Sequence, residues 1–176
     1  EAEFNYKYYE GTWSQLPDFD TLTPKTTGIF SSIDISIRER DAEFALMWEG
    51  FIYIPVAGNY TFETRSDDGS KLYIGTYDEA NLVVTNDGTH SMRSREGTYS
   101  FSKAGVYPIV VTYFQGGGSG KGLEIYWSNT AHGVERELIP IGMFRSDYTF
   151  PEATPEMPTN VVATTISYEE ILVTWD

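Results

Sequence analysis

The chain has 176 residues, a formal net charge of −14, 15% aromatic residues and no cysteine. This length suffices for one domain with a sizeable core, and the lack of cysteine excludes a disulfide scaffold, thiolate metal sites and a cysteine nucleophile. The negative charge argues against nucleic acid as a partner, and no apolar run reaches the ~18 residues of a membrane span.

Strand patterns dominate the chain, and helical periodicity is weak almost throughout. Residues 33–37 alternate strictly between apolar and polar, which predicts a strand. Further strands are predicted at residues 43–48, 51–54, 60–64, 72–74, 82–84, 99–101, 106–114 and 123–127, and a short helix at 79–81. Glycine, asparagine and aspartate separate these runs at regular intervals, so we predict an all-β fold, an antiparallel sandwich or barrel. Because Pro108 interrupts the longest run, we expect that strand to be an edge strand or to carry a bulge.

The composition changes near residue 150. Residues 5–147 are predicted to form the main domain, and the proline-rich residues 148–158 to form a stiff linker. Residues 159–176 predict two strands and resemble the truncated start of a fibronectin type III domain. Two strands cannot bury a sandwich core. The segment therefore implies a longer modular chain, or else it packs as a hairpin on the first domain.

The most informative motif is the pair Asp67–Asp68, which stands in a short turn between two predicted strands. Successive strand side chains point to opposite faces, so two carboxylates converge only where the backbone is bent. Converging carboxylates repel each other unless a cation lies between them, and oxygen ligands suit Ca2+. The alternative is an ordinary solvated turn, because aspartate and glycine are common turn residues.

A glycine-rich segment, residues 114–122, is a candidate second half of such a site. Alone it is typical of a flexible linker, but the strands predicted on both sides make it a hairpin loop. Glycines allow a tight turn that presents carbonyl groups inward. Gln115 adds a side-chain oxygen.

Several motifs, in their order and spacing, resemble the PA14 domain family over roughly residues 6–145. They are Tyr-Tyr-Glu-Gly-Thr-Trp at 8–13, the runs at 48–55 and 58–62, Ser-Asp-Asp-Gly-Ser-Lys-Leu-Tyr-Ile-Gly at 66–75, and the runs at 105–114 and 122–127. Sugar-binding members, such as yeast flocculin-type adhesins, hold Ca2+ with an aspartate pair joined by a cis peptide and with a second loop. The bound Ca2+ contacts sugar hydroxyls directly.

The resemblance implies a set of site residues in this chain. The second loop lacks the asparagine or aspartate that several relatives use there. The implied metal ligands are therefore Asp67, Asp68, Gln115, Gly116 and Gly118. The implied sugar-binding residues are Asp67, Asp68, Gln115 and Ser119, with Tyr77 or Trp13 stacked on the sugar face. For both aromatic residues the alternative is a place in the core.

These observations favour a non-catalytic, Ca2+-dependent carbohydrate-binding module that binds a mono- or oligosaccharide. We expect it to be secreted or at the cell surface, as a monomeric unit of a multidomain adhesin or glycan-degrading enzyme. The alternative is a structural or protein-interaction PA14 module without sugar affinity. An enzyme is disfavoured, because no nucleophile elbow and no phosphate loop appear, and His90 and His132 lack metal-ligand spacing.

Overall fold

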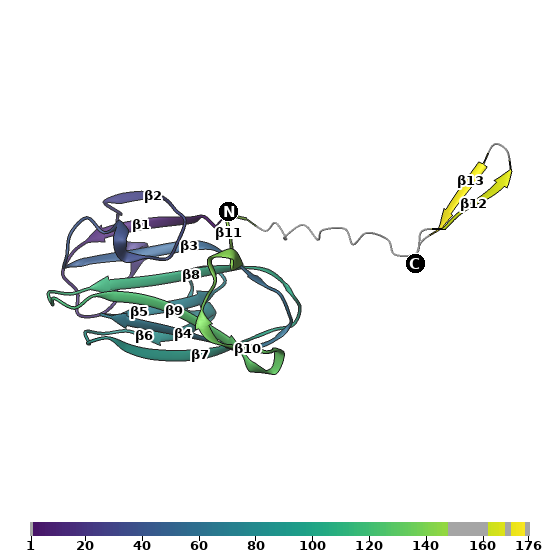
Figure 1. Cartoon of the computed structure of the whole chain (residues 1–176). Coiled ribbons are helices and arrows are strands. Elements are labelled where there is room, and N and C mark those ends of the chain that lie inside the picture. Colours follow the sequence, from purple (N-terminus) through teal and green to yellow (C-terminus); the bar gives the residue numbers. More distant parts are fainter. Residues whose placement is uncertain (1, 148–161, 168–169, 175–176) are drawn as a thin grey trace.

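The computed structural model describes residues 2–147, 162–167 and 170–174. Residues 2–147 form two sheets, in which every strand pair is antiparallel, stacked face to face (Figure 1). This arrangement confirms the predicted all-β antiparallel sandwich. The described part contains no helix that is long and apolar enough to cross a membrane.

The larger sheet has the strand order β2-β1-β3-β8-β5-β6, and β11 also pairs with β3. Its strands are β1 (Phe4–Glu10), β2 (Thr26–Phe30), β3 (Phe44–Ile54), β5 (Ser70–Ile74), β6 (Leu82–Asn86), β8 (Gly105–Gln115) and β11 (Phe144–Arg145). The smaller sheet has the order β10-β9-β4-β7. Its strands are β4 (Gly58–Asp67), β7 (Arg93–Phe101), β9 (Gly122–Asn129) and β10 (Val134–Leu138).

Short 3-10 helices lie in the connections of this domain. They are η1 (Phe19–Thr21), η2 (Ile35–Ile37), η3 (Glu79–Asn81), η4 (Thr130–His132) and η5 (Ile141–Met143). The helix predicted at residues 79–81 is thus present, as the single turn η3. Asp78 begins it, because its carboxylate accepts a hydrogen bond from the backbone N–H of Ala80 at 2.8 Å.

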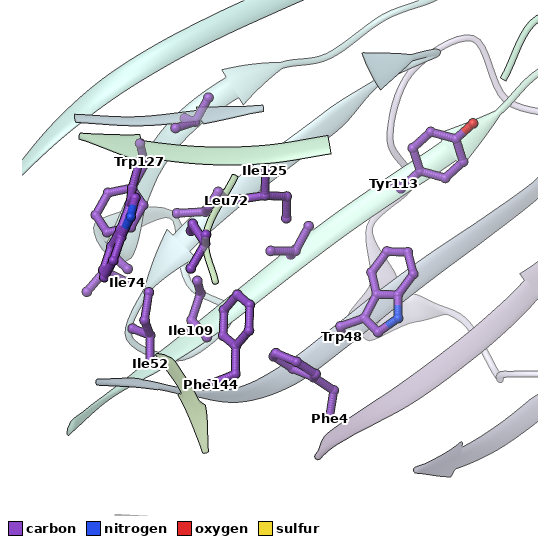
Figure 2. Packing of buried hydrophobic residues seen from close by; sticks show 14 of the residues in the cluster. Phe4, Trp48, Ile52, Leu72, Ile74, Ile109, Tyr113, Ile125, Trp127 and Phe144 are labelled. Atoms are coloured by element: carbon purple, nitrogen blue, oxygen red, sulfur yellow. The ribbon is translucent and has the colours of Figure 1, made fainter. Parts of the chain in front are cut away.

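The main core fills the space between the two sheets (Figure 2). Trp48 and Leu72 of the larger sheet are completely buried there, and Trp127 of the smaller sheet is 2% exposed. Burial of each such side chain contributes roughly 1.5–3 kcal/mol. The alternation along β5 sends Leu72 and Ile74 into this core and Lys71 and Tyr73 to the outer face of the sheet.

A second apolar cluster covers that outer face. It consists of Tyr9, Phe19, Ala45, Met47, Tyr73, Val110 and Phe114. The segment that carries η1 supplies Phe19, which packs edge-to-face on Tyr9. The central strands β3 and β8 are therefore buried on both faces, and their sequences are nearly continuous apolar runs.

The prediction of a strand at residues 33–37 is wrong. These residues form the turn η2, because the Asp34 carboxylate accepts a hydrogen bond from the backbone N–H of Ser36 at 2.6 Å. Such a side-chain cap competes with sheet pairing. Ile33, Ile35 and Ile37 still pack partly buried against the main core, which explains their apolar spacing.

The expectation for Pro108 is wrong too, because β8 is a central strand between β3 and β5 and its register opposite β3 shows no shift. The carbonyl oxygen of Pro108 accepts a hydrogen bond from the N–H of Gly75 at 2.8 Å. The N and C=O of one residue face the same neighbour in an antiparallel ladder. The nitrogen of Pro108, which carries no hydrogen, therefore faces Gly75. Because Gly75 lies one residue beyond the end of β5, the sheet loses no hydrogen bond there.

Two further strands follow, β12 (Val162–Ser167) and β13 (Glu170–Thr174), and they pair with each other in antiparallel fashion. The sequence predicted two strands in this segment. The linker predicted at residues 148–158 lies outside the described residues. The likeness of residues 159–176 to fibronectin type III stays a prediction.

Candidate functional site

Three connections cross from the larger to the smaller sheet, or back, at one end of the sandwich. They join β4 to β5, β6 to β7, and β8 to β9. The register places them together, since Ser70 pairs with both Tyr113 and Asn86, while Asp67 pairs with Gly122. The Asp67–Asp68 turn and the glycine-rich loop therefore meet, as the two-loop hypothesis requires.

Asp68 connects all three loops. The peptide bond between Asp67 and Asp68 is cis, the form that the family resemblance implies. Asp68 is only 4% exposed. Its Oδ1 accepts a hydrogen bond from the N–H of His90 at 2.9 Å, and its Oδ2 accepts one from the N–H of Gly116 at 2.8 Å. The backbones of two other loops thus fix the position of this carboxylate.

Asp67 lies beside Asp68 in an electrostatically unfavourable place. Burial raises the pKa of the Asp67 carboxyl, and the neighbouring charge of Asp68 raises it further. The charges of His90 and Lys121 and the backbone N–H of Met92 act in the opposite direction. A cation bound between the two carboxylates would remove their repulsion and favour the ionised form of Asp67.

A buried polar network supports the turn from below. The hydroxyl of Ser70 lies 2.7 Å from that of Ser66 and 2.9 Å from that of Thr64. The side-chain amide of Asn86, which is completely buried, donates to the carbonyl oxygens of Thr64 and Arg93 at 3.2 and 3.0 Å. These bonds hold β4, β5, β6 and the start of β7 together directly beneath Asp67 and Asp68.

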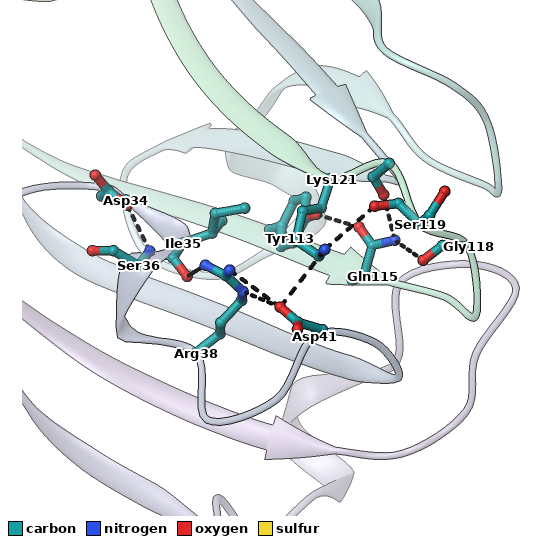
Figure 3. Close-up of polar contacts among 11 residues, drawn as sticks. Asp34, Ile35, Ser36, Arg38, Asp41, Tyr113, Gln115, Gly118, Ser119 and Lys121 are labelled. Carbon is teal, nitrogen blue, oxygen red and sulfur yellow. Dashed lines mark hydrogen bonds and ion pairs between the residues drawn. The ribbon is translucent and has the colours of Figure 1, made fainter.

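Gln115 acts as a brace inside the second loop (Figure 3). Its side chain is completely buried. Its Oε1 accepts a hydrogen bond from the hydroxyl of Tyr113 at 2.6 Å, and its Nε2 donates to the carbonyl oxygen of Gly120 at 2.7 Å. The same Tyr113 hydroxyl also lies within bonding distance of the carbonyl oxygen of Asp67. Gln115 therefore ties the loop to the aspartate turn.

The other implied ligands of this loop differ in how open they are. The carbonyl oxygen of Gly116 accepts a hydrogen bond from the N–H of Glu43 at 3.1 Å. Gly118 and Ser119 are exposed. The carbonyl oxygen of Gly118 has a long contact of 3.5 Å with Gln115 Nε2, and that of Ser119 has one of 3.3 Å with Lys121 Nζ. The exposed tip is thus the part of the loop most open to a bound ion.

The two candidate stacking residues lie in different places. Trp13 is half-buried: its backbone carbonyl lies beside Gly116, at the rim of the loop cluster, while its side chain packs against the second apolar cluster. Tyr77 lies beyond the other end of β5. Its ring packs edge-to-face on Phe19 and Tyr73, and its hydroxyl accepts a hydrogen bond from the N–H of Phe19 at 3.4 Å. The structure does not bring Tyr77 to the aspartate pair.

The structure also brings residues to the site that the sequence reasoning missed. They are His90 and Met92 from the β6–β7 connection and Lys121 from the second loop. For His90 the sequence showed only the lack of metal-ligand spacing. Its backbone N–H, not its ring, reaches Asp68, and no residue-type signal marks such a contact. The β6–β7 connection lies near the Asp67–Asp68 turn because β6 pairs with β5 and β7 pairs with β4, and only this pairing predicts the contact.

The groups around Asp67 and Asp68 can be compared with the ligands that Ca2+, the metal implied by the resemblance, prefers. Within the described ranges, no three side chains of histidine, cysteine, aspartate or glutamate gather as a metal site. A cation at Asp67 and Asp68 therefore needs backbone carbonyls, water or a ligand to complete its shell. Carboxylate and carbonyl oxygens are the donors that Ca2+ prefers. Asp67, Asp68 and the tip of the second loop thus fit Ca2+.

The stacked sheets, with loops of both sheets gathered at one end, define a β-sandwich domain with a loop-borne site. The family model of the PA14 domain matches residues 5–137, and the chain belongs to this family. A comparison with curated proteins found no similar sequence.

Several solved structures share the fold. An anti-sigma factor domain-containing protein has 19% identity and a TM-score of 0.65 over 83% of this chain and 48% of that one, so the chain spans about half of its length. The PA14 sugar-binding domain from an RTX adhesin has 16% identity and a TM-score of 0.62 over 82% and 98%. The A domain of epithelial adhesin 9 from Candida glabrata, in complex with Galβ1-4GlcNAc, has 13% identity and a TM-score of 0.52 over 80% and 86%. At these identities the likeness is one of fold.

Proposed function

We propose that this chain is a non-catalytic carbohydrate-binding module in which Asp67 and Asp68 hold a Ca2+ ion that binds sugar hydroxyls. One observation carries the proposal. Two adjacent carboxylates are brought to one point, and the backbone of two further loops fixes one of them. Placing two negative charges together costs free energy, and a cation bound between them would offset this cost.

The relatives support the same ligand class. One structural neighbour is a sugar-binding PA14 domain of an adhesin, and another is an adhesin domain in complex with a galactose-containing disaccharide. We extend to this chain the carbohydrate class, a secreted or cell-surface location, and a place within a larger multidomain chain. The particular sugar is left to experiment.

The chain's own residues have separable tasks in this proposal. Asp68 is the fixed ligand, and Asp67 is the ligand whose ionisation the cation favours. Carbonyl groups at the exposed tip around Gly118 and Ser119 supply further oxygens. When bound, Ca2+ would take two neighbouring sugar hydroxyls as ligands and so select for their stereochemistry. Trp13, whose backbone carbonyl lies beside Gly116, is the candidate for stacking an aromatic face on the sugar ring.

A second candidate function is a structural PA14 module without sugar affinity. The second loop favours it, because the side-chain oxygen of Gln115 and the carbonyl oxygen of Gly116 already accept hydrogen bonds within the chain. In this case Ca2+ would bind weakly or not at all.

Calorimetric titration distinguishes the two candidates. We would titrate CaCl2, and then a panel of monosaccharides and disaccharides with Ca2+ or with EDTA, into the chain, into Asp67→Asn and into Glu135→Gln. Glu135 is an exposed residue of β10 and serves as the control. The proposal requires Ca2+-dependent sugar binding that Asp67→Asn weakens tenfold or more, by analogy with the roughly 10–100-fold effects of disturbing metal sites, while Glu135→Gln leaves it unchanged. Weak or absent Ca2+ binding would refute the metal site and favour the structural module, and Ca2+ binding without a sugar response would refute the sugar-binding role.

A further inference from the structure

A hollow of about 520 Å³ lies on the outer face of the larger sheet, and its lining includes neither aspartate of the pair and no residue of the second loop. Its floor is formed by β5, through Lys71 and Tyr73. Its walls are the segment that leads into η1 and the turn between β5 and η3. Tyr77, which was predicted from the family resemblance as a sugar-stacking residue, lines this hollow and not the aspartate site.

Tyr73 is the unusual residue of the hollow. The residue as a whole is only 2% exposed, but its hydroxyl is not among the fully enclosed atoms of the described residues: it makes no hydrogen bond within them and opens to the hollow. A hydroxyl that opens to a hollow forms its hydrogen bond with whatever fills that hollow, water or ligand. Burial also raises the pKa of this phenol well above its usual value, so it remains a protonated donor at neutral pH. The hydroxyl therefore offers a hydrogen bond that only a molecule in the hollow can accept.

Two further donors lie close by. The hydroxyl of Tyr77 accepts a hydrogen bond from the N–H of Phe19 at 3.4 Å, which leaves its own proton for another acceptor. Lys71 Nζ lies 3.3 Å from a carboxylate oxygen of Glu79, and an ammonium group has three protons to donate. The rings of Tyr73 and Tyr77, packed edge-to-face at 5.3 Å, add aromatic surface.

Acceptors line the same hollow. Asp18 and Asp78 each use one carboxylate oxygen to accept a backbone N–H, at the starts of η1 and η3 respectively. Their other oxygens, and the carboxylate of Asp20, have no side-chain partner in the described part of the chain. Glu79 completes the acidic wall.

We propose that this hollow is a second sugar subsite, which binds one residue of a neutral oligosaccharide without Ca2+. Each sugar hydroxyl both donates and accepts, and the hollow mixes phenol and ammonium donors with carboxylate acceptors. Tyrosine rings supply the apolar surface that sugar faces need. The lining contains four acidic side chains and one lysine, and this excess of negative charge disfavours acidic sugars. The inference rests on the proposed ligand class but not on the metal.

The test uses the whole chain, titrated once in EDTA, so that the metal site does not contribute, and once in CaCl2. Amide chemical shifts would be followed by NMR during titrations with lactose, maltotriose, cellotriose and mannotriose. The variants are Tyr73→Phe and the control Tyr107→Phe, whose hydroxyl bonds to the carbonyl oxygen of Lys103 at 2.7 Å. For at least one probe we expect shifts at Asp20, Tyr73 and Tyr77, with an affinity about fivefold lower in Tyr73→Phe and unchanged in Tyr107→Phe. Because the Tyr73 hydroxyl has no partner in the chain, Tyr73→Phe should not lower the melting temperature.

The outcomes separate this inference from the proposed function. Sugar-induced shifts that occur only around Asp67 and disappear in EDTA would overturn the second subsite and leave the Ca2+-dependent site standing. EDTA-resistant shifts at the hollow would support the subsite even if Ca2+ does not bind at Asp67. A hollow that responds to CaCl2 but to none of the four probes is a cation site, and the inference would be wrong.

Discussion

Gly120 controls where the carboxylate of Asp67 can lie. A Cβ at position 120 would overlap with Asp67 Oδ2, whereas one at position 117 would meet nothing within 4 Å. We therefore predict that Gly120→Ala displaces the carboxylate and lowers Ca2+ affinity about tenfold or more, while Gly117→Ala leaves it unchanged. Calorimetric titration of CaCl2 into both variants measures this difference.

The comparison of the two glycines also separates two explanations. Both substitutions stiffen the same loop by a similar amount, because alanine restricts the unfolded and folded backbone alike. Only Gly120 touches Asp67. An equal loss of affinity in both variants would show that loop flexibility matters, and not the placement of the carboxylate.

The sequence pointed to the candidate site through neighbouring residues and, for the second loop, through the family resemblance. Asp67 and Asp68 stand together in the chain, so their shared charge is visible at once. The groups that hold Asp68 are backbone N–H donors 22 and 48 residues away. Every residue except proline carries such a donor, so residue type gives no signal for it. Their position follows from strand register, which the sequence patterns did not give.

At the scale of elements, Asn86 links strands of both sheets. Its amide nitrogen donates to the carbonyl oxygen of Thr64 in β4, and its Oδ1 accepts from Arg93 Nε in β7 at 2.9 Å. We predict that Asn86→Ala lowers the free energy of unfolding by about 3 kcal/mol, because several buried groups lose their partners. Thr85→Ala, at an exposed position of the same strand, should change it by less than about 0.5 kcal/mol.

Urea denaturation of both variants checks this prediction. Equal unfolding midpoints for Asn86→Ala and Thr85→Ala would mean that water replaces the amide without loss. A lower midpoint together with weaker Ca2+ binding would indicate that the network beneath the turn also keeps Asp67 and Asp68 in place.

The sequence predicted most strands, but it missed β1, β2, β10 and β11 and divided β3 into two. Two further errors have local causes. The run at 33–37 has the alternation of a strand, but Asp34 forms its hydrogen bond with the backbone two residues later and closes a turn. The prediction of an edge strand or a bulge at Pro108 considered only the missing N–H of proline. Since β5 ends at Ile74, the central strand β8 can hold a proline at that position without losing a ladder bond. In both cases a specific hydrogen-bond geometry overrides a general preference.

At the scale of the molecule, the sandwich topology brings the loops of the site together at one end. Each crossing between the sheets leaves its backbone outside both ladders, so these loops have N–H and C=O groups to offer. Three such crossings meet at Asp67 and Asp68, and the segment around Trp13 joins them, because the N–H of Leu16 donates to Asp87 Oδ1 at 2.7 Å. The order of strands within the sheets, which creates this meeting, could not be derived from strand patterns alone.

The acid stability of the whole domain should depend on Glu63, in the centre of the smaller sheet. Arg136 Nε and Nη2 donate to its two carboxylate oxygens at 2.6 and 2.8 Å, and this pairing holds the pKa of Glu63 below its usual value of 4.5. An acid with a lowered pKa in the folded state stabilises that state above its unfolded pKa, and loses this contribution as the pH falls through the folded pKa.

We therefore predict that Glu63→Gln has a lower melting temperature than the unaltered chain at pH 7. The gap should narrow as the pH falls below about 4.5 and close once Glu63 is protonated in both states. Glu135→Gln, at an exposed position of β10, is the control and should follow the unaltered chain at every pH. Melting curves from pH 7 to about pH 3 measure the gap. A gap that stays constant over this range would show that Glu63 acts through packing and hydrogen-bond geometry, because only a contribution from its charge disappears on protonation.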